Sequence, residues 1–596
     1  MEKTLFQNLL SIISQFRLRL IIAVFLLCLS NFLLILNPLI FRQALLFLTP
    51  QTTEVQGKFS ELFRNLLGPY LYSVYVWAAI LLGVAFVSSI LKYYMRTIFI
   101  VISREVEEQL RIKLFDRIEK QSHAFFDRYG IGDLLSRLTN DMTAYRDLIG
   151  PGLMYPIFSF TLIFPAVVTL FNLSIPLALI SLFPIFGVYT INLLFRRPLF
   201  RFSEAVQESL AKMSVMAHEH FSGIRIIKSY VIEKETFQLF KKLCHSFQYL
   251  SFRFNCLKDL VFPLLSLINK ITTLTLVFLA GVLILKELGT LNLADFLSFM
   301  WIQSYIFTPL LLLGWILPMY QKGSAAYLRL VHIYDEPLEV FENTAPIRHI
   351  PSNADICFKG LSFFYPGQSK PALSHIHLHI KAGTFIGITG PVGSGKTTLF
   401  RLLNREYEVP KGQIYIGERE IHDFSLEAFH QGMVTVEQVP FLFSKTIADN
   451  MRFGNYEASQ EEIEMVARQA DLHDSIIEFP EQYSTMVGER GVSLSGGQKQ
   501  RVAVARAFLV NRSILLLDDI FSAVDVATEH RIFEAMKKNF AGKTLLLITH
   551  RVSILEQLNR VIYMVDGQIL EEGSPQELTK MNGKYAALVD LQKLNL

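Results

Sequence analysis

The sequence has 596 residues, of which 51% are hydrophobic, and its mean hydropathy is +0.35. This composition excludes a soluble enzyme of ordinary type, because a chain of this length would expose too much apolar surface to water. The net charge of +4 is too small to indicate a class of partner.

The first part of the chain is predicted to lie in a membrane. The opening stretch "MEKTLFQNLLSIISQFRLRL" lacks the pattern of a cleaved leader and is interpreted as an amphipathic lead-in to the first span. Six apolar runs are long enough to cross about 30 Å of hydrocarbon. They cover residues 20–41, 71–91, 153–171, 175–195, 260–285 and 296–317.

Basic residues assign the sides of the membrane. The segments 92–146 and 196–258 are rich in Arg and Lys, whereas the connections 48–70, 172–174 and 286–294 carry few. The basic segments are therefore expected to be cytosolic, together with both termini and the rest of the chain after the sixth span.

The two long cytosolic segments show apolar residues at helical spacing among balanced charges, so spans 2 to 3 and 4 to 5 are expected to continue as long helices. Glycines interrupt this pattern at residues 125–141 and 220–235, which are predicted to be the turning points. Aromatic and apolar residues at these tips suggest that they grip a partner domain; the alternative is a pair of solvated helical hairpins.

Polar residues are few within the spans, and "INKITTLT" in the fifth span stands out because it contains Asn269 and Lys270. A lysine at membrane depth usually faces a protein interior or a water-filled cavity. We expect Asn31 and Gln303, in the first and sixth spans, to share such a substrate cavity. The alternative is that Lys270 snorkels to the interface, or that the span begins or ends one helical turn away from the predicted position.

Four cysteines, Cys28, Cys244, Cys256 and Cys357, are scattered without metal-ligand spacing, so neither a disulfide framework nor a zinc site is expected. The segment 331–352 is interpreted as a linker to a soluble domain over residues 353–596.

A phosphate-binding loop opens the chemistry of the soluble domain. The stretch "GTFIGITGPVGSGKTTLF" contains a strand, a glycine-rich turn and the start of a helix, with the pattern GxxxxGK[ST]. Glycines let backbone N–H groups close around phosphate oxygens at a helix N-terminus. Lys396 is expected to reach the β- and γ-phosphates of ATP, and Thr397 to ligate Mg²⁺. The candidate nucleotide-binding residues here are Gly390, Gly393, Ser394, Gly395, Lys396, Thr397 and Thr398.

Two further motifs follow in the same domain. The apolar run "ILLLDD" is typical of a buried parallel strand, and Asp518 at its end is placed to hold Mg²⁺. The second motif consists of Ser495, Gly496, Gly497 and Gln498. Its paired glycines leave the N-terminus of another helix accessible, which is a second surface that can bind phosphate. One nucleotide does not need two such cradles in one domain. Each cradle is therefore expected to close over a nucleotide held by another subunit.

The order and spacing of "GPVGSGKTT", "EQVPFLFSKTIADN", "VGERGVSLSGGQKQR", "ILLLDD", "SAVD" and "LLLITHR" resemble the nucleotide-binding domain of an ATP-binding cassette (ABC) transporter. The resemblance covers nearly the whole chain. It implies a multi-domain half-transporter: a six-helix transmembrane domain of the exporter type over residues 1–330, then an α/β P-loop nucleotide-binding domain over residues 353–596.

The resemblance also implies roles for single residues. Tyr365 looks like the aromatic residue that stacks on adenine, which any purine face permits. Gln438 matches the glutamine that senses the γ-phosphate and Mg²⁺, and His550 matches the switch histidine at the γ-phosphate. Asp525 of "SAVD" resembles the residue that communicates across the dimer.

Three more residues, Gly488, Glu489 and Arg490, match a loop specific to exporters that lies near the cytosolic hairpins. The hairpins at 125–141 and 220–235 correspond to the coupling helices of the family, which favours the gripping role.

One departure from the family pattern concerns the residue after the magnesium aspartate, which is Asp519 and not glutamate. Aspartate is one methylene shorter, about 1.5 Å in reach. A misplacement of about 1 Å can cost roughly 100-fold in rate, and general-base assistance is worth about 10² to 10⁴. The site on this chain's phosphate loop is therefore expected to bind ATP well and hydrolyse it poorly.

The sequence thus combines Asp519 with an intact "LSGGQ" motif and an intact His550. This combination resembles the less active subunit of heterodimeric bacterial exporters, such as the MdlA-like multidrug half-transporters. We expect ATP-driven export of amphipathic or lipid-like small molecules by alternating access, in a bacterial inner membrane and with no nucleic-acid partner. The alternatives are a homodimer with two slow sites, a lipid flippase, and an ATP-gated channel or regulatory protein. An importer is disfavoured because no binding-protein domain is present.

Overall fold

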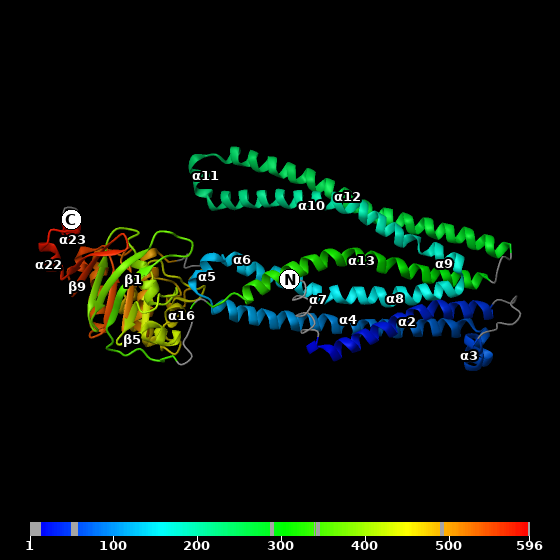
Figure 1. Ribbon diagram of the computed structural model, residues 1–596, viewed down its shortest axis with the longest axis horizontal. Helices are drawn as coiled ribbons and strands as arrows, with labels where there is room; N and C mark the ends of the chain where they lie inside the picture. The colour runs from blue at the N-terminus through cyan, green and yellow to red at the C-terminus, as the bar shows by residue number, and fades with distance from the viewer. Residues whose placement is uncertain are drawn as a thin grey trace. The chain divides into compact units, whose positions relative to one another are not determined.

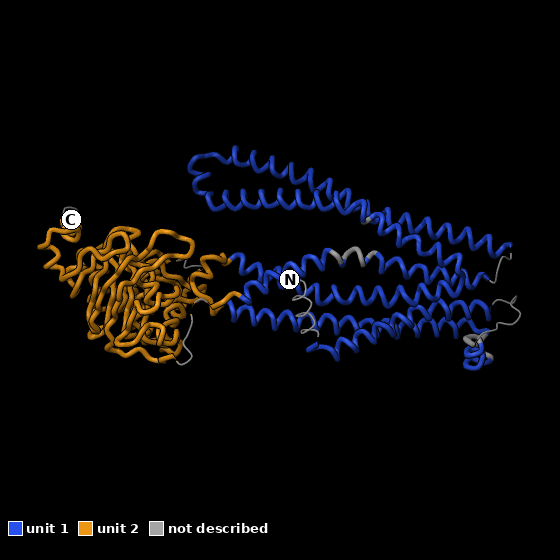
Figure 2. Tube along the Cα trace, viewed as in Figure 1, with its two compact units in different colours: residues 1–118, 132–335 blue, residues 119–131, 336–596 orange. Residues whose placement is uncertain are grey.

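The computed structural model describes residues 14–48, 58–286, 291–338, 340, 346–488 and 494–593. The chain divides into two compact units (Figure 2). The first comprises residues 1–118 and 132–335, and the second comprises residues 119–131 and 336–596. The start of the first predicted hairpin therefore belongs to the same unit as the nucleotide-binding motifs.

The described part of the first unit is helical (Figure 1). Long helices dominate because the apolar runs continue into segments with helical periodicity, and the helices continue through internal prolines such as Pro38, Pro198 and Pro263. The elements are α2 (Arg17–Leu48), α3 (Lys58–Leu67), η1 (Gly68–Tyr72), α4 (Val74–Glu119), α6 (Ile131–Ser136), η2 (Arg137–Asp141), α7 (Met142–Ile149), α8 (Pro151–Leu173), α9 (Ile175–Ser181), α10 (Phe183–Ser222), α11 (Ile224–Tyr230), α12 (Glu233–Leu285) and α13 (Leu293–Tyr334).

Five helical stretches among the described residues are long and apolar enough to cross a membrane. They are Arg17–Leu48, Val74–Glu119, Ile131–Leu173, Ile175–Ser222 and Glu233–Leu285. The sixth predicted span, 296–317, lies within α13, and some of its side chains fall outside the described set. The count of six spans stays a prediction.

The second unit is built on two sheets. The larger has the strand order β10-β9-β3-β8-β7-β6, in which β10 alone is antiparallel to its neighbour. Its strands are β3 (Phe385–Thr389), β6 (Met433–Val436), β7 (Ile514–Asp518), β8 (Thr544–Ile548), β9 (Arg560–Val565) and β10 (Gln568–Gly573). The smaller, antiparallel sheet has the order β2-β1-β4-β5. Its strands are β1 (Ile356–Phe363), β2 (Leu373–Ile380), β4 (Ile414–Ile416) and β5 (Arg419–Glu420).

Helices accompany these sheets in the second unit. They are α5 (His123–Arg128), α14 (Lys396–Leu403), η3 (Ile421–Asp423), α15 (Leu426–Gly432), α16 (Ile447–Arg452), α17 (Gln460–Gln469), α18 (His473–Ile477), η4 (Gln482–Ser484), α19 (Gly496–Val510), α20 (Val526–Asn539), α21 (Val552–Leu555), α22 (Pro575–Lys580) and α23 (Lys584–Lys593).

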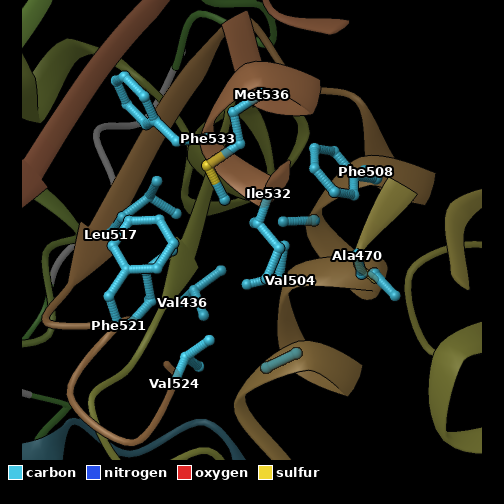
Figure 3. Packing of buried hydrophobic residues seen from close by; sticks show 14 of the residues in the cluster. Val436, Ala470, Val504, Phe508, Leu517, Phe521, Val524, Ile532, Phe533 and Met536 are labelled. Carbon is cyan, nitrogen blue, oxygen red and sulfur yellow. The ribbon is translucent and has the colours of Figure 1, made fainter. Parts of the chain in front are cut away.

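The central strands β7 and β8 are apolar except for Asp518 at the end of β7 and Thr544 at the start of β8, because both faces of the sheet are covered. Every residue of β7 and β8 is buried. Figure 3 shows Leu517 of β7 in one core with Phe508 of α19 and with Phe533 and Met536 of α20. This packing fixes the ends of β7 and β8, where the candidate site lies.

Candidate functional site

The phosphate-binding loop connects β3 to α14 and lines a cleft of about 350 Å³. Lys396, the first residue of α14, is buried. Its Nζ donates hydrogen bonds to the carbonyl oxygens of Gly390 (2.9 Å) and Pro391 (2.7 Å), and to the hydroxyl of Ser394 (3.2 Å). The loop thus surrounds the ammonium group of Lys396, which is the group predicted to contact the phosphates of ATP.

Two of the loop glycines are required by geometry. Gly390 has φ of +141°, and a Cβ there would lie 2.0 Å from the carbonyl oxygen of Met564. Gly395 has φ of +95°, and its Cβ would lie 2.7 Å from the carbonyl oxygen of Ala372. Other residues at these positions would displace the loop that must surround the phosphates.

Oxygen ligands suited to Mg²⁺ meet beside this loop. Asp518 is buried at the end of β7, and burial raises the pKa of its carboxyl group, opposed by a hydrogen bond from Thr397 and by the charge of Lys396. A hydroxyl and a carboxylate fit Mg²⁺, which prefers oxygen. No group of three His, Cys, Asp or Glu side chains gathers among the described residues, so phosphate and water oxygens would have to complete the coordination.

Asp519 follows directly and lies in the left-handed backbone region, with φ of +45°. Its N–H donates to the carbonyl oxygen of Ile548 in β8 over 2.9 Å, and its Oδ2 accepts a hydrogen bond from Nε2 of Gln438 over 3.2 Å. Burial raises the pKa of Asp519, opposed by the nearby His550. Burial and the charge of Lys396 lower the pKa of His550. The carboxylate, the amide, the imidazole and the loop lysine therefore share one edge of the sheet.

Tyr365 lines the same cleft. Its hydroxyl and the Thr398 hydroxyl are 3.0 Å apart and share a hydrogen bond. The ring contacts Phe363 and Tyr407 edge to face, with centroids 5.2 and 5.3 Å away. The aromatic group is therefore held beside the phosphate loop, where the predicted adenine contact requires it.

The second predicted phosphate-binding motif, Ser495 to Gln498, which we call the signature, lies away from the cleft in this unit. Ser495 caps α19 by a reciprocal pair of hydrogen bonds with Gln498. Gly497 packs closely on the segment after β7, because a Cβ there would lie 2.6 Å from the carbonyl oxygen of Ala523. Ser495 and Gly496 are exposed, and among the described residues that line the cleft none belongs to the signature. Asp525 caps α20, since its Oδ1 accepts from the N–H of Thr528 over 3.0 Å.

The predicted substrate-cavity residues are dispersed. Asn31 is buried and its Nδ2 donates to Thr161 of α8 over 2.8 Å. Gln303 is buried and donates to the carbonyl oxygen of Ser181 over 3.4 Å. Lys270 is exposed on α12, and Asn269 beside it is half-buried. The structure thus gives Asn31 and Gln303 different neighbours, and their sharing a cavity with Lys270 stays a prediction.

The first hairpin contributes α5, which contacts residues after α14 within the second unit. The N–H of His123 donates to the carbonyl oxygen of Glu406 over 3.2 Å. The hydroxyl of Tyr407 donates to Oδ2 of Asp127 over 2.5 Å, and Ala124 is buried in the core. The second hairpin forms α11, whose neighbours Phe221 and Val231 are exposed. Of the predicted loop at 488–490, Glu489 and Arg490 lie outside the described residues.

Two family models match the chain: "ABC transporter transmembrane region" over residues 20–310 and "ABC transporter" over residues 373–522. The multidrug resistance-like ATP-binding protein MdlA of Buchnera aphidicola (subsp. Schizaphis graminum) is 31% identical over 525 residues, which cover 88% of this chain and 90% of that protein. The chain belongs to the ABC transporter family.

Other comparisons agree with this assignment. MdlA of Escherichia coli is 31% identical over 87% of this chain and 88% of its own length. The ATP-dependent lipid A-core flippase of Syntrophus aciditrophicus is 31% identical over 84% of this chain and 82% of its own. The structure of a bacterial Atm1-family ABC exporter with ATP bound superposes with a TM-score of 0.77 at 22% identity, covering 97% of this chain and 99% of that one.

This ABC transporter is therefore an integral membrane half-transporter with the exporter fold, and it uses ATP and Mg²⁺. Exporters of this kind work as dimers of half-transporters. The predicted family, fold class and cofactors are confirmed. The roles given to single residues stay predictions, although the structure places the phosphate loop, Asp518, Asp519, Gln438 and His550 at one edge of the sheet.

Sequence reasoning missed two residues of the nucleotide-binding unit, the buried Gln500 and the half-buried Arg551. Gln500 joins the Gln438 backbone to Ser522, and Arg551 pairs with the buried Glu529. Both stand inside quoted motifs, "LSGGQKQR" and "LLLITHR", so their positions carried a signal. Their contacts did not, because these depend on loops that are distant in sequence.

Proposed function

We propose that this ABC transporter is one half of a heterodimeric exporter whose own phosphate-loop site hydrolyses ATP poorly. The proposal assigns export of amphipathic or lipid-like small molecules to the dimer, from the inner membrane of a bacterium, with the nucleotide-binding units in the cytosol. The main hydrolytic site lies on the partner's phosphate loop.

The observation that carries the proposal is the position of Asp519. Hydrogen bonding of its N–H to Ile548 ties its backbone to β8, and the preceding Asp518 pairs with the same residue of that strand. The backbone therefore cannot slide forward to replace the missing methylene, about 1.5 Å of reach. Its side chain is also held by Gln438. A water in line with the γ-phosphate would lie beyond this carboxylate, and a shift of about 1 Å is enough to cost roughly 100-fold.

The signature residues support a second, competent site on the partner. Ser495 and Gly496 are exposed at a capped helix N-terminus, which favours an anion. No signature residue lines this chain's own cleft in the described structure. In the dimer, the surface around Ser495 and Gly496 would complete the ATP site on the partner's phosphate loop. The partner's signature would in turn cover the ATP site on this chain's phosphate loop.

The hairpins support transmission between membrane and nucleotide units. Helix α5 contacts Glu406 and Tyr407, so it would couple the first hairpin to this chain's own nucleotide-binding unit. The exposed apolar residues around α11 would dock on the partner's unit. Closure of the two nucleotide-binding units over ATP would then move both helix pairs and turn the cavity outward.

A lipid flippase is the second candidate, because two similar proteins are named ATP-dependent lipid A-core flippases. Both candidates use the same ATP cycle and differ in cargo. Uptake of a fluorescent amphipathic dye into inverted vesicles, compared with inward movement of a fluorescent phospholipid in the same vesicles, separates them.

The asymmetric assignment is tested by ATP hydrolysis of the purified complex. Asp519→Glu is expected to raise turnover, because a glutamate restores the reach of the base. Changing the partner's corresponding glutamate to glutamine is expected to nearly abolish turnover. If that partner variant keeps most of its activity, the assignment of the main site is wrong.

A further inference from the structure

The short helix α3 and the turn η1 stand between two membrane helices, α2 and α4. In α3, apolar and polar residues occupy opposite sides of the helix. Positions four apart lie on one face of a helix, so the apolar pairs Leu62/Leu66 and Phe63/Leu67 form neighbouring stripes. The polar side carries Glu61, Arg64 and Asn65.

One apolar stripe fixes α3 to the ends of its neighbours. The ring of Phe63 lies 5.0 Å from that of Trp77, near the start of α4. Trp77 is buried, and it stacks at 6.1 Å on Phe47, near the end of α2. Leu67 packs against the same cluster. The helix is therefore seated where α2 ends and α4 begins.

The direction of α3 differs from that of its neighbours. Figure 1 shows it lying across the line of α2 and α4, beside their shared end. Since α2 and α4 are long and apolar enough to cross the membrane, a helix across their ends runs along the membrane surface. Its length of 10 residues is too short to span a bilayer.

The second apolar stripe has no cover in the described structure. Leu62 is 51% exposed and Leu66 is 71% exposed. The following residues continue this character, because Tyr70, Tyr72 and Tyr75 are exposed by 65%, 73% and 88%. Tyrosine is enriched at membrane–water interfaces, where its ring meets the acyl chains and its hydroxyl meets water.

We propose that α3 and η1 form an interfacial anchor that binds the phospholipid headgroup region at the shared end of α2 and α4. The exposed stripe of Leu62 and Leu66 enters the acyl boundary, while Glu61 and Arg64 face water. A phospholipid surface is favoured over a second protein chain by three features together: the crosswise direction, the polar stripe opposite, and the tyrosines at the entrance of α4. The anchor would hold this end of α2 and α4 at a fixed depth. It rests on the membrane-spanning character of the chain and not on the heterodimer proposal.

Collision of nitroxide labels with oxygen and with a water-soluble nickel chelate tests this depth. The four native cysteines, Cys28, Cys244, Cys256 and Cys357, are first replaced by serine or alanine. One label is then attached through Leu66→Cys and, as a matched control on the polar side of the same helix, another through Arg64→Cys. The full-length transporter is reconstituted in bilayers of phosphatidylcholine and phosphatidylglycerol. Binding of a fluorescent ATP analogue by each labelled protein verifies its fold, since both positions are exposed.

The expected result is an oxygen-to-nickel collision ratio at least about threefold higher at residue 66 than at residue 64, because oxygen concentrates in the acyl region and the chelate in water. Leu62→Cys should behave as Leu66→Cys does. Equal ratios at 64 and 66 would place α3 in water and overturn the proposal. A label at 66 shielded from both reagents would also overturn it, because a protein surface would then cover the stripe.

Discussion

The side-chain amide of Gln500 donates a hydrogen bond to the carbonyl oxygen of Gln438 over 3.2 Å. The same amide nitrogen donates to the Ser522 hydroxyl over 2.9 Å. The amide oxygen of Gln500 accepts a hydrogen bond from the N–H of Ala523 over 3.2 Å. One buried side chain of the signature helix therefore connects the loop that carries Gln438 to the segment that follows Asp519. If nucleotide bound to a partner moved this helix, the Gln500 side chain would transmit the movement to the Gln438 loop and to the segment after Asp519.

This connection predicts the effect of Gln500→Met. Methionine is similar in size but removes the hydrogen bonds to the Gln438 carbonyl oxygen, the Ser522 hydroxyl and the Ala523 N–H, each worth about 0.5–1.5 kcal/mol. We expect turnover at saturating ATP to fall by about tenfold or more, while the affinity for a fluorescent ATP analogue changes little. Lys499→Met, one position earlier and only half-buried, serves as the control. Equal turnover in the two variants would show that the connection has no role in hydrolysis.

Tyr365 provides a test of the adenine assignment. Tyr365→Ala is expected to weaken ATP binding by about 5- to 150-fold, because base–aromatic stacking is worth about 1–3 kcal/mol. Tyr365→Phe keeps the ring and loses only the hydrogen bond to Thr398, so it should bind within about threefold of the unmodified chain. Titration with a fluorescent ATP analogue measures both. If Ala and Phe weaken binding equally, the hydroxyl matters and the ring does not stack on the base.

Much of the nucleotide-binding unit could be predicted from sequence, because its motifs stand at the ends of buried parallel strands. The apolar runs ILLL before Asp518 and LLLI, which ends two positions before His550, indicated the strands and so the edge where their ends meet. The glycines at 390 and 395 were expected for close backbone approach, and the contacts of their missing Cβ atoms agree.

The remainder depended on relationships that sequence spacing does not contain. The segment 119–131 joins the nucleotide-binding unit through contacts with residues nearly 300 positions away, such as Asp127 with Tyr407. The polar residues of the spans were grouped by depth alone. Depth does not tell which side of a helix a residue occupies, so Asn31 and Gln303 could not be distinguished from exposed Lys270.

The pKa of His550 predicts a pH dependence of local stability. In the folded chain, burial and Lys396 lower this pKa below its usual 6.5. The unfolded state therefore binds a proton that the native state resists, and stability falls as pH falls below about 6.5. Hydrogen exchange of the β8 amides, without nucleotide, should be less protected at pH 5.5 than at pH 7.5, after correction for intrinsic rates. His550→Gln cannot take up the proton and should lose most of this difference. The same loss of protection in both proteins would assign the pH dependence to another group.

Arg551, next to His550, predicts a larger effect on stability. Its guanidinium pairs with the fully buried carboxylate of Glu529 and donates to the carbonyl oxygens of Phe521 (2.7 Å) and Val524 (2.6 Å). Arg551→Met would leave the Glu529 charge buried without its cation, which typically costs about 3–5 kcal/mol. We expect a corresponding loss of hydrogen-exchange protection in α20 and β8.

A second variant separates the buried charge from lost packing. Adding Glu529→Gln to Arg551→Met removes the unpaired charge and should restore more than half of the lost stability. The surface pair of Arg531 with Asp471 is the matched control, because Arg531 is exposed and Arg531→Met should cost at most about 1 kcal/mol. If the double variant is as unstable as Arg551→Met alone, the arginine acts through the two carbonyl oxygens, and Glu529 is incidental to the fold at this edge.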